Sequence, residues 1–396
     1  MPAGVYLHIP FCKSRCSYCD FATDVYRNND AVERYVGAVC GEIEEFLPQI
    51  NADDADKDIV SDLRFPRSSA ANSSSDIDTI YFGGGTPSLL APNQLEKILD
   101  AVHSKFSVAS SREITMEMNP ATVTLKSLKE YRSLGVNRAS FGVQTFDDTE
   151  LKRLARGHNA DDARATFRLL CDAGFENISF DLIAGLPRQT LADWERNLDE
   201  ALALQPEHLS LYLLEIHEGT PLATQVRDGR QPMPDENLAA EMYELMLDKV
   251  TDAGYEQYEI SNFAKPGFES RHNTKYWRLE PVYGYGVSAH SFDGFQRYAN
   301  ERDTAKYVER IEGFGGAEVM RERIDAASEF VFLGLRLNCG IDLYEYKNRF
   351  GVDLGEKYSA ELRELQEAGL IEIEGTNFSL TRLGMLFSNE VFRVFV

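Results

Sequence analysis

The sequence lacks the features that tie a protein to a membrane or to nucleic acid. Its 396 residues contain no apolar run of membrane-spanning length, and the start Met-Pro-Ala-Gly-Val-Tyr has neither the basic segment nor the long apolar stretch of a secretory signal. Basic residues are scarce, 41 against 64 acidic ones, so the formal charge is −23. Because phosphate backbones are bound mainly through clustered Lys and Arg, this deficit argues against a nucleic-acid partner. We therefore expect a cytoplasmic protein with no membrane span.

Cysteine is also scarce, which excludes a disulfide scaffold. The chain has six cysteines, and three of them, Cys12, Cys16 and Cys19, fall within eight residues. This clustering indicates a metal site. The other three stand alone in helical or strand-like surroundings, and we interpret them as buried, unreactive thiols: Cys40, Cys171 and Cys339.

Short β-branched or aromatic runs alternate regularly with amphipathic segments in the first half of the chain. The predicted strands are 5–9, 79–82, 113–118, 138–142, 177–182 and 209–214. The predicted helices between them are 31–47, 92–106, 124–134, 161–173 and 191–204. Such an alternation predicts an α/β protein with a parallel sheet. With six βα units instead of eight, an open, partial (β/α)6 TIM-type barrel fits better than a closed one.

The composition divides the chain into three parts. Residues 1–215 form the predicted barrel core, interrupted at 51–78 by an acidic and then Ser-rich stretch that we interpret as a flexible insertion. Residues 216–319 form a predicted extension of helices and strands. Residues 320–396 predict a small C-terminal α+β domain with a β-hairpin, and a winged-helix-like form is one interpretation of it.

The unusual residues of the barrel follow the ends of its predicted strands. The cysteine loop follows the first strand, Gly83-Gly84-Gly85-Thr86-Pro87 the second, Asn119-Pro120 the third, Gln144 the fourth and Gly185-Leu186-Pro187 the fifth. Because the carboxyl ends of parallel strands meet at one rim, we expect these loops to form a common site.

The spacing Cys12-x-x-x-Cys16-x-x-Cys19 predicts a 4Fe–4S cluster. Three thiolates on one short loop can hold three corners of the cube, which leaves one iron without a protein ligand. That open iron can bind the amine and carboxylate of S-adenosylmethionine (SAM) and pass an electron to its sulfonium. The alternative is a zinc site with His8 as fourth ligand. Zinc ligands usually come as two pairs from separate segments, and the sequence offers no second pair at such spacing, so we favour the cluster.

Three motifs together carry a family resemblance. Tyr6-x-His8-Ile9-Pro10-Phe11-Cys12, the Cys-x-x-x-Cys-x-Tyr-Cys spacing and Gly83-Gly84-Gly85-Thr86-Pro87 resemble the radical SAM proteins related to oxygen-independent coproporphyrinogen III oxidase. The resemblance covers nearly the whole chain apart from 51–78. It implies a 4Fe–4S cluster on the three cysteines and SAM as a second cofactor. The SAM contacts that it implies are Tyr6, Tyr18, Gly84, Gly85, Thr86, Glu117, Gln144, Arg156 and Asp181.

Elementary chemistry gives several of these implied contacts a reason. Tyr18 offers an aromatic face to the adenine, and the glycines of 84–86 allow the methionine amine to approach the backbone closely. A guanidinium binds carboxylates in a bidentate fork, which suits Arg156 to the SAM carboxylate. Glu117 can accept from the SAM amine or a ribose hydroxyl, and Asp181 can hold ribose hydroxyls.

Two departures argue against the oxidase activity of that family. The oxidases carry a fourth cysteine one residue after the third, whereas Phe21 stands there in Cys19-Asp20-Phe21. They also carry a substantial region before the cluster loop, whereas eleven residues precede Cys12 in this sequence.

A second motif points to haem. Arg271-His272-Asn273-Thr274-Lys275-Tyr276-Trp277, in the predicted extension, resembles the His-Asn-x-x-Tyr-Trp motif of the haem chaperone branch of the same family. The resemblance implies that His272 is an axial ligand to haem iron through a neutral imidazole. Tyr276 and Trp277 would then pack against the porphyrin.

Three functions remain open at this point. The leading one is a haem chaperone that binds haem and a SAM-ligated 4Fe–4S cluster and delivers haem to an acceptor protein such as a respiratory cytochrome, with peripheral contact to respiratory complexes. The second is an oxygen-independent coproporphyrinogen III oxidase, and the third is another radical SAM enzyme. Whether SAM is cleaved or only bound, and so whether the protein is an enzyme, stays undecided between them.

Overall fold

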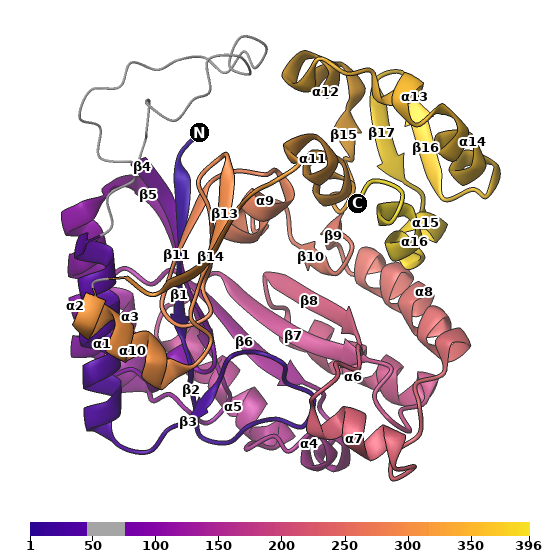
Figure 1. Ribbon diagram of the computed structural model, residues 1–396. Helices are drawn as coiled ribbons and strands as arrows, with labels where there is room; N and C mark the ends of the chain where they lie inside the picture. Colours follow the sequence, from indigo (N-terminus) through magenta and orange to yellow (C-terminus); the bar gives the residue numbers. More distant parts are fainter. Residues whose placement is uncertain (46–75, 315) are drawn as a thin grey trace, which may run out of the picture.

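The core of the fold is a curved parallel sheet. The computed structural model describes residues 1–45, 76–314 and 316–396. Six parallel strands lie in the spatial order of the chain: β1 (Ala3–Ile9), β4 (Asp76–Gly84), β5 (Ser107–Met118), β6 (Arg138–Gln144), β7 (Ile178–Ala184) and β8 (His208–Leu213). The helices that connect them are α1 (Asn29–Glu45), α2 (Pro92–Lys105), α3 (Leu125–Ser133), α4 (Asp148–Arg153), α5 (Ala160–Asp172) and α6 (Leu191–Leu204). They cover the outer face of the sheet (Figure 1).

Side chains alternate between two buried faces of this sheet. On β4, Ile80 and Phe82 point outward and are completely buried in the main apolar core beneath the helices. Thr79 and Tyr81, the alternate residues, are also buried, but their hydroxyls have partners inside the barrel. Because successive side chains of a strand point to opposite faces, the outer face is apolar and the lumen is polar.

The sheet extends beyond the six strands at both edges. In the described residues it has twelve strands, in the order β14-β13-β12-β11-β1-β4-β5-β6-β7-β8-β10-β9. The added strands are β9 (Glu256–Glu259), β10 (Asn262–Ala264), β11 (Val282–Tyr285), β12 (His290–Phe292), β13 (Gln296–Asn300) and β14 (Glu318–Arg323). β11 runs parallel to β1, and the other five pair antiparallel with their neighbours. The predicted open barrel is thus confirmed, and the strands of the extension at 216–319 continue its sheet.

Helices of the extension pack around this sheet. They are α7 (Pro221–Arg227), α8 (Glu236–Asp252), α9 (Arg271–Trp277) and α10 (Thr304–Phe314). α9 begins after Ser270, whose hydroxyl accepts a hydrogen bond from the Asn273 amide, as an N-cap residue does. It packs beside β4 and against the C-terminal domain.

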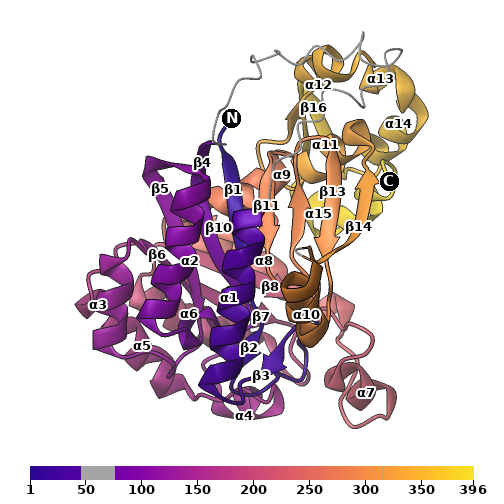
Figure 2. The ribbon, with the colours of Figure 1, turned by 60° about the vertical axis from the view of Figure 1, so that its left-hand side comes forward.

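The C-terminal domain has its own small sheet and apolar core. Its helices are α11 (Ala326–Gly334), α12 (Leu343–Phe350), α13 (Leu354–Lys357), α14 (Ser359–Glu367), α15 (Arg382–Leu386) and α16 (Ser388–Phe392). Its strands are β15 (Ile341–Asp342), β16 (Ile371–Glu374) and β17 (Asn377–Leu380), in the order β15-β17-β16. β16 and β17 form the predicted antiparallel hairpin. The core of this domain includes Ile260, Leu279 and Phe292 of the extension, which join it to the barrel. The domain lies beside α9 (Figure 2).

Some local expectations need correction. Helix α4 was not predicted, because six residues are too few to show a helical period. Of the insertion predicted at 51–78, residues 51–75 lie outside the described residues, and 76–78 begin strand β4. Cys171 and Cys339 are exposed and Cys40 is partly exposed, so the prediction of buried thiols was wrong. No described helix is long and apolar enough to cross a membrane.

Candidate cluster and cofactor site

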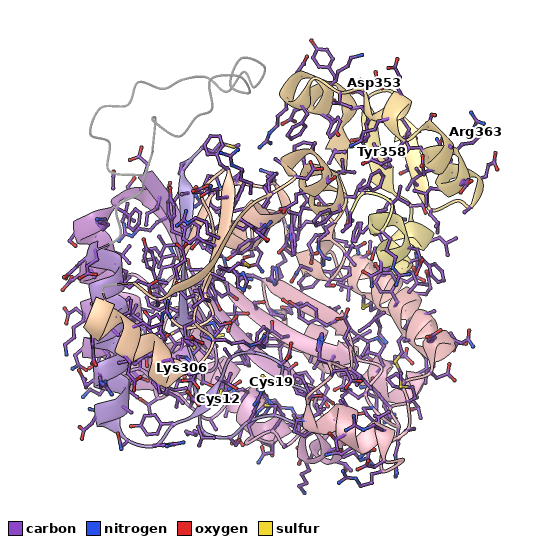
Figure 3. All side chains as sticks on the ribbon, in the orientation of Figure 1. Cys12, Cys19, Lys306, Asp353, Tyr358 and Arg363 are labelled. Carbon is purple, nitrogen blue, oxygen red and sulfur yellow. The ribbon has the colours of Figure 1, made fainter. Side chains whose placement is uncertain are left out.

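The loops that carry the predicted site residues meet at one end of the barrel. All six core strands are parallel, so their carboxyl ends form a single rim. The cysteine loop follows β1 and is held by a short parallel ribbon, β2 (Phe11–Cys12) with β3 (Asp24–Val25). Cys12 and Cys19 lie at this end of the barrel, far from the C-terminal residues Asp353, Tyr358 and Arg363 (Figure 3).

The second strand's loop contacts the first cysteine. The Thr86 hydroxyl donates to Cys12 Sγ at 3.5 Å and accepts from Asn119 Nδ2 at 2.7 Å. The Gly85 amide donates to the carbonyl of Ile9 at 2.7 Å. A Cβ at Gly85 would lie 2.6 Å from the backbone of Pro10, so only glycine allows this approach.

Arg156 lies beside the second cysteine. Its Nη1 donates to Cys16 Sγ at 3.4 Å and to the Tyr18 hydroxyl at 3.5 Å. Its Nη2 donates to Asn119 Oδ1 at 2.7 Å and to the carbonyl of Gly142 at 2.6 Å. Its Nε is buried and has no partner among the described residues. A fixed guanidinium with an unused donor next to a thiol suits an anionic group such as a carboxylate.

Glu117 is fixed inside the lumen through both carboxylate oxygens. The Tyr81 hydroxyl donates to Oε1 at 2.8 Å, and the Gly84 amide donates to Oε2 at 3.0 Å. Burial raises the pKa of Glu117 to about 7, and the nearby Asp181 adds to this effect, whereas the two hydrogen bonds and Arg138 oppose it. Glu117 therefore changes charge near neutral pH.

Asp181 and Gln144 complete the ring of predicted residues. Asp181 sits on β7 directly across from Gly142 and accepts hydrogen bonds from the hydroxyls of Ser140 and Ser210. Burial raises its pKa, and Arg138 opposes this shift most strongly. Gln144 ends β6 in a left-handed conformation with φ of 68° and is buried. Such strained backbone at a strand end is typical of residues placed for a ligand.

Tyr6 and His8 connect the lumen with the cysteine loop. His8 Nε2 donates to the carbonyl of Ala22 at 2.8 Å, so its Nδ1 accepts from the Tyr6 hydroxyl at 3.1 Å. Burial lowers the pKa of His8, which keeps the ring neutral. Both ring nitrogens are engaged, and this geometry opposes the zinc alternative with His8 as a ligand.

The cysteine loop offers the donor set of a cluster. The loop carries three partly exposed thiols. A cubic cluster with one open iron requires three separate thiolates. Among the residues that the structure describes, no three His, Cys, Asp or Glu side chains converge as they do around a single ion. Burial raises the pKa of Cys12 and of Cys19, so their thiolate forms depend on a bound cation.

His272 lies elsewhere, at the amino ends of the strands. Its Nδ1 is 2.9 Å from Thr79 Oγ1, near the start of β4, and its Nε2 is 3.3 Å from the Tyr276 hydroxyl. It is only 1% exposed, and burial lowers its pKa to about 3. Gly4 leaves room for it, because a Cβ there would lie 3.1 Å from the imidazole. The imidazole is neutral, as the haem interpretation requires, but it is enclosed.

A charged network holds the helix that carries His272. The buried carboxylate of Glu113 on β5 accepts from the amides of Arg271 and His272. Lys275, 5% exposed, pairs with Asp78 and Glu280. Helix α9 thus lies at the amino ends of the strands, and the structure does not bring His272 to the cysteine loop.

The sequence analysis missed Tyr81, Asn119 and Glu113 as members of the site. Tyr81 lies in a predicted strand, but its pairing with Tyr6 and its hydrogen bond to Glu117 require the strand register and the fold. Asn119 was noted only as part of a strand-end loop. Glu113 carried no signal, because its partner lies 158 residues away in the chain.

Comparisons with known proteins agree with this architecture. The sequence profile of the Radical SAM superfamily matches residues 6–201, and that of the HemN C-terminal domain matches residues 322–387. The solved structure of coproporphyrinogen III oxidase (HemN) from Escherichia coli, described as a radical SAM enzyme, has a TM-score of 0.83 and 23% identity. It covers 100% of this chain and 90% of its own. At that identity it shows the fold alone.

Closer relatives are found among curated proteins. Heme chaperone HemW of Bacillus subtilis is 36% identical over 99% of both chains. Heme chaperone HemW of Lactococcus lactis is 33% identical over 100% of this chain and 97% of its own. Similarity at this level over the full length of both relatives shows that the chain belongs to the HemW family of radical SAM proteins.

Proposed function

We propose that this chain is a haem chaperone that binds haem and a SAM-ligated 4Fe–4S cluster and passes haem to an acceptor protein. The observation that carries the proposal is the full-length similarity to relatives named heme chaperone HemW. The acceptor that we propose is a respiratory cytochrome, which the chaperone would contact at the cytoplasmic side of the membrane.

In this proposal Cys12, Cys16 and Cys19 hold the cluster, which when bound supplies one-electron chemistry to the SAM sulfonium. The protein positions SAM. Arg156, with its unused Nε, suits the carboxylate. Glu117 and Asp181 present carboxylate oxygens to the amine and ribose hydroxyls. The other proposed SAM contacts line the same rim and lumen: Tyr6, Tyr18, Gly84, Gly85, Thr86 and Gln144.

His272 is the proposed haem ligand, but in this conformation its imidazole is enclosed by other side chains. Both of its ring nitrogens have neighbours, and the ring is enclosed by Tyr6, Tyr81 and Tyr276. Ligation of haem therefore requires α9 to move away from the barrel. The exposed His290 on β12 lines a small cavity with Tyr276 and is an alternative imidazole that needs no such movement.

The second candidate function is oxygen-independent coproporphyrinogen III oxidase. The fold shared with HemN supports it. The residue Phe21, which stands where those enzymes have a fourth cysteine, argues against it.

A spectrophotometric hemin titration of the purified protein tests the proposal. We expect one saturable site in the wild type and its loss or strong weakening in His272→Ala. His290→Ala tests the neighbouring imidazole, and His103→Ala, on an exposed face of α2, is the matched control.

Absence of a saturable site in the wild type contradicts the chaperone proposal. Turnover of coproporphyrinogen III by the anaerobically reconstituted protein would place the oxidase first. Loss of the site in His290→Ala alone would keep the chaperone and reassign the ligand.

A further inference from the structure

Tyr81 stands between the proposed SAM site and the proposed haem ligand. It lies in the middle of β4, next to Tyr6 of β1 in the parallel ladder. Its hydroxyl reaches Glu117, and its ring lies against His272. No other described residue contacts both groups through such interactions.

The hydroxyl of Tyr81 fixes the carboxylate of Glu117. It donates to Oε1 at 2.8 Å, while the Gly84 amide holds Oε2 at 3.0 Å. With one donor on each oxygen, the carboxylate plane cannot rotate without loss of a buried hydrogen bond. Hydrogen bonds to ionised groups stabilise more than neutral ones, so this arrangement sets where Glu117 presents its remaining lone pairs.

The ring of Tyr81 is in turn held by His272. The two ring centroids are 5.1 Å apart with an interplanar angle of 28°, and Tyr6 lies 6.1 Å from Tyr81 at 28°. The packing leaves no slack: a Cβ at Gly83 would lie 2.9 Å from both tyrosine rings, and one at Gly4 would lie 3.1 Å from His272. Removal of the imidazole would therefore open a space beside Tyr81.

We propose that Tyr81 is a positioning residue that fixes Glu117 for SAM, and that His272 holds Tyr81 in place, so that haem ligation by His272 weakens SAM binding. The second half rests on the proposed function. The imidazole of His272 cannot pack against Tyr81 inside the barrel and ligate haem iron outside it at the same time. By linkage, haem and SAM then reduce each other's affinity by the same factor.

Isothermal titration of SAM into the anaerobically reconstituted protein tests the positioning role. In Tyr81→Phe the ring remains and only the hydroxyl is lost, and we expect SAM affinity to fall about tenfold. Tyr131→Phe is the matched control, because Tyr131 is also buried and its hydroxyl donates to the Leu90 carbonyl at 2.7 Å, away from Glu117. Wild-type affinity in Tyr81→Phe would overturn the positioning role.

The pH dependence of SAM affinity separates positioning from general damage. The groups that face Glu117 are Tyr81 on β4, Arg138 on β6 and Asp181 on β7, and its charge also acts on Tyr6 and Tyr212. Of the groups facing it, only the Tyr81 hydroxyl is removed in Tyr81→Phe. Because that hydrogen bond lowers the pKa of Glu117, we expect the midpoint of SAM binding, near pH 7 in the wild type, to move to higher pH. An unshifted midpoint would contradict the proposal.

The coupling is tested with hemin present and absent. We expect saturating hemin to weaken SAM binding severalfold in the wild type. His272→Ala should weaken SAM binding without hemin, and His272→Phe, which restores a ring but cannot ligate iron, should recover SAM affinity and make it insensitive to hemin. Circular dichroism checks that each variant is folded.

The outcomes distinguish this inference from the proposed function. If hemin binds saturably and SAM affinity does not change, the coupling is wrong and the chaperone stands. If hemin does not bind at all, the proposed function fails, while Tyr81→Phe still decides the positioning role.

Discussion

At the scale of single residues, the lumen of this barrel is filled with polar side chains. Barrels of this type usually fill their interior with bulky apolar residues. Here Tyr81, Glu117 and Asp181 point inward with Arg138 among them, and each of the three is buried enough to raise its pKa. A polar lumen of this kind suits a ligand with amine, hydroxyl and carboxylate groups, and its close packing depends on glycines such as Gly83.

Gly83→Ala should damage the SAM site without unfolding the protein. The new Cβ would lie 2.9 Å from the rings of Tyr6 and Tyr81 and 3.2 Å from Glu117 Oε1. We expect SAM affinity to fall at least about tenfold and the free energy of unfolding to fall by about 1–3 kcal/mol, as overpacking does.

Gly37→Ala is the control for this variant, because Gly37 lies within α1 with no atom within 4 Å of its added Cβ. It should raise stability by about 0.5–1 kcal/mol and leave SAM binding unchanged. Titration of SAM and denaturant unfolding measure both effects. Unaltered SAM affinity in Gly83→Ala would show that the lumen can accommodate the added methyl group, which would contradict the tight packing around Gly83.

At this scale the sequence identified residues with distinctive types in short motifs. The three cysteines, Arg156 and the glycines at 84–85 could be named because a motif surrounds them. Tyr81 could not be named without the strand register, since a tyrosine in a β-rich run usually belongs to an ordinary core. Gly4, whose role is to leave room for a ring from residue 272, requires the tertiary fold.

At the scale of elements, the cysteine loop packs on the end of the barrel and does not contribute its thiols to the apolar core. Its backbone is tied down by bonds such as Ser17 N–H to the Leu154 carbonyl and Tyr26 N–H to the Cys12 carbonyl. These bonds do not involve the thiols. The loop therefore keeps its course when a thiol is replaced.

Cys12→Ala, Cys16→Ala and Cys19→Ala should each abolish the brown absorbance of the reconstituted cluster. We expect the far-ultraviolet circular dichroism and the cooperative unfolding of the apoprotein to remain, because the barrel has its own large core. Unfolding of all three variants would show that the cluster is needed for the fold itself.

Glu113 is one of the groups that hold helix α9 at the amino ends of the strands. Glu113→Ala would leave the amides of Arg271 and His272 buried without an acceptor. We expect the free energy of unfolding to fall by about 1–3 kcal/mol. Glu96→Ala, on the exposed face of α2, should change it by less than about 0.5 kcal/mol in the same urea titrations. If both substitutions lowered the free energy of unfolding equally, Glu113 would not anchor helix α9.

The periodicity of the sequence predicted the six strands and five of the six connecting helices. Their boundaries came within three residues, except that β5 begins six residues before the predicted strand 113–118. The agreement arises because buried parallel strands have continuous apolar runs and the helices carry apolar stripes. The same reasoning could not place α9. Its motif suggested a haem-binding surface, whereas contacts with residues on β1, β4 and β5 bury His272.

At the scale of the whole molecule, buried ionisable groups make stability depend on pH in opposing directions. Burial raises the pKa of Glu42 to about 7, although Tyr307, Asn300 and the Gly286 amide all donate to it. Between pH 4.5 and 7 the folded protein therefore binds more protons than the unfolded chain at this site. The free energy of unfolding falls there as pH rises.

Buried histidines act the other way in part of this range. The pKa of His158 is lowered to about 4 and that of His272 to about 3, mainly by burial. Between these values and 6.5 the unfolded chain binds more protons, so the free energy of unfolding rises with pH. The two contributions oppose each other, and only a difference between variants isolates one of them.

Glu42→Gln removes the carboxyl contribution. The free energy of unfolding of the variant minus that of the wild type should increase from pH 4.5 to pH 7 by up to about 3 kcal/mol. Any stability that the variant loses through its altered hydrogen bonds is constant over this range. The test is therefore the slope of the stability difference against pH. Urea unfolding at several pH values measures it, and a flat difference would show that Glu42 stays ionised in the fold.

As a haem chaperone, the protein should transfer its haem directly to another protein. The most direct test of this transfer is to load the reconstituted protein with one equivalent of hemin and follow the Soret band on addition of an apo b-type cytochrome. We expect transfer at a rate that rises with acceptor concentration and exceeds the rate of haem loss to a passive scavenger. Retention of the haem, or release at the scavenger rate whatever the acceptor concentration, would contradict the chaperone function.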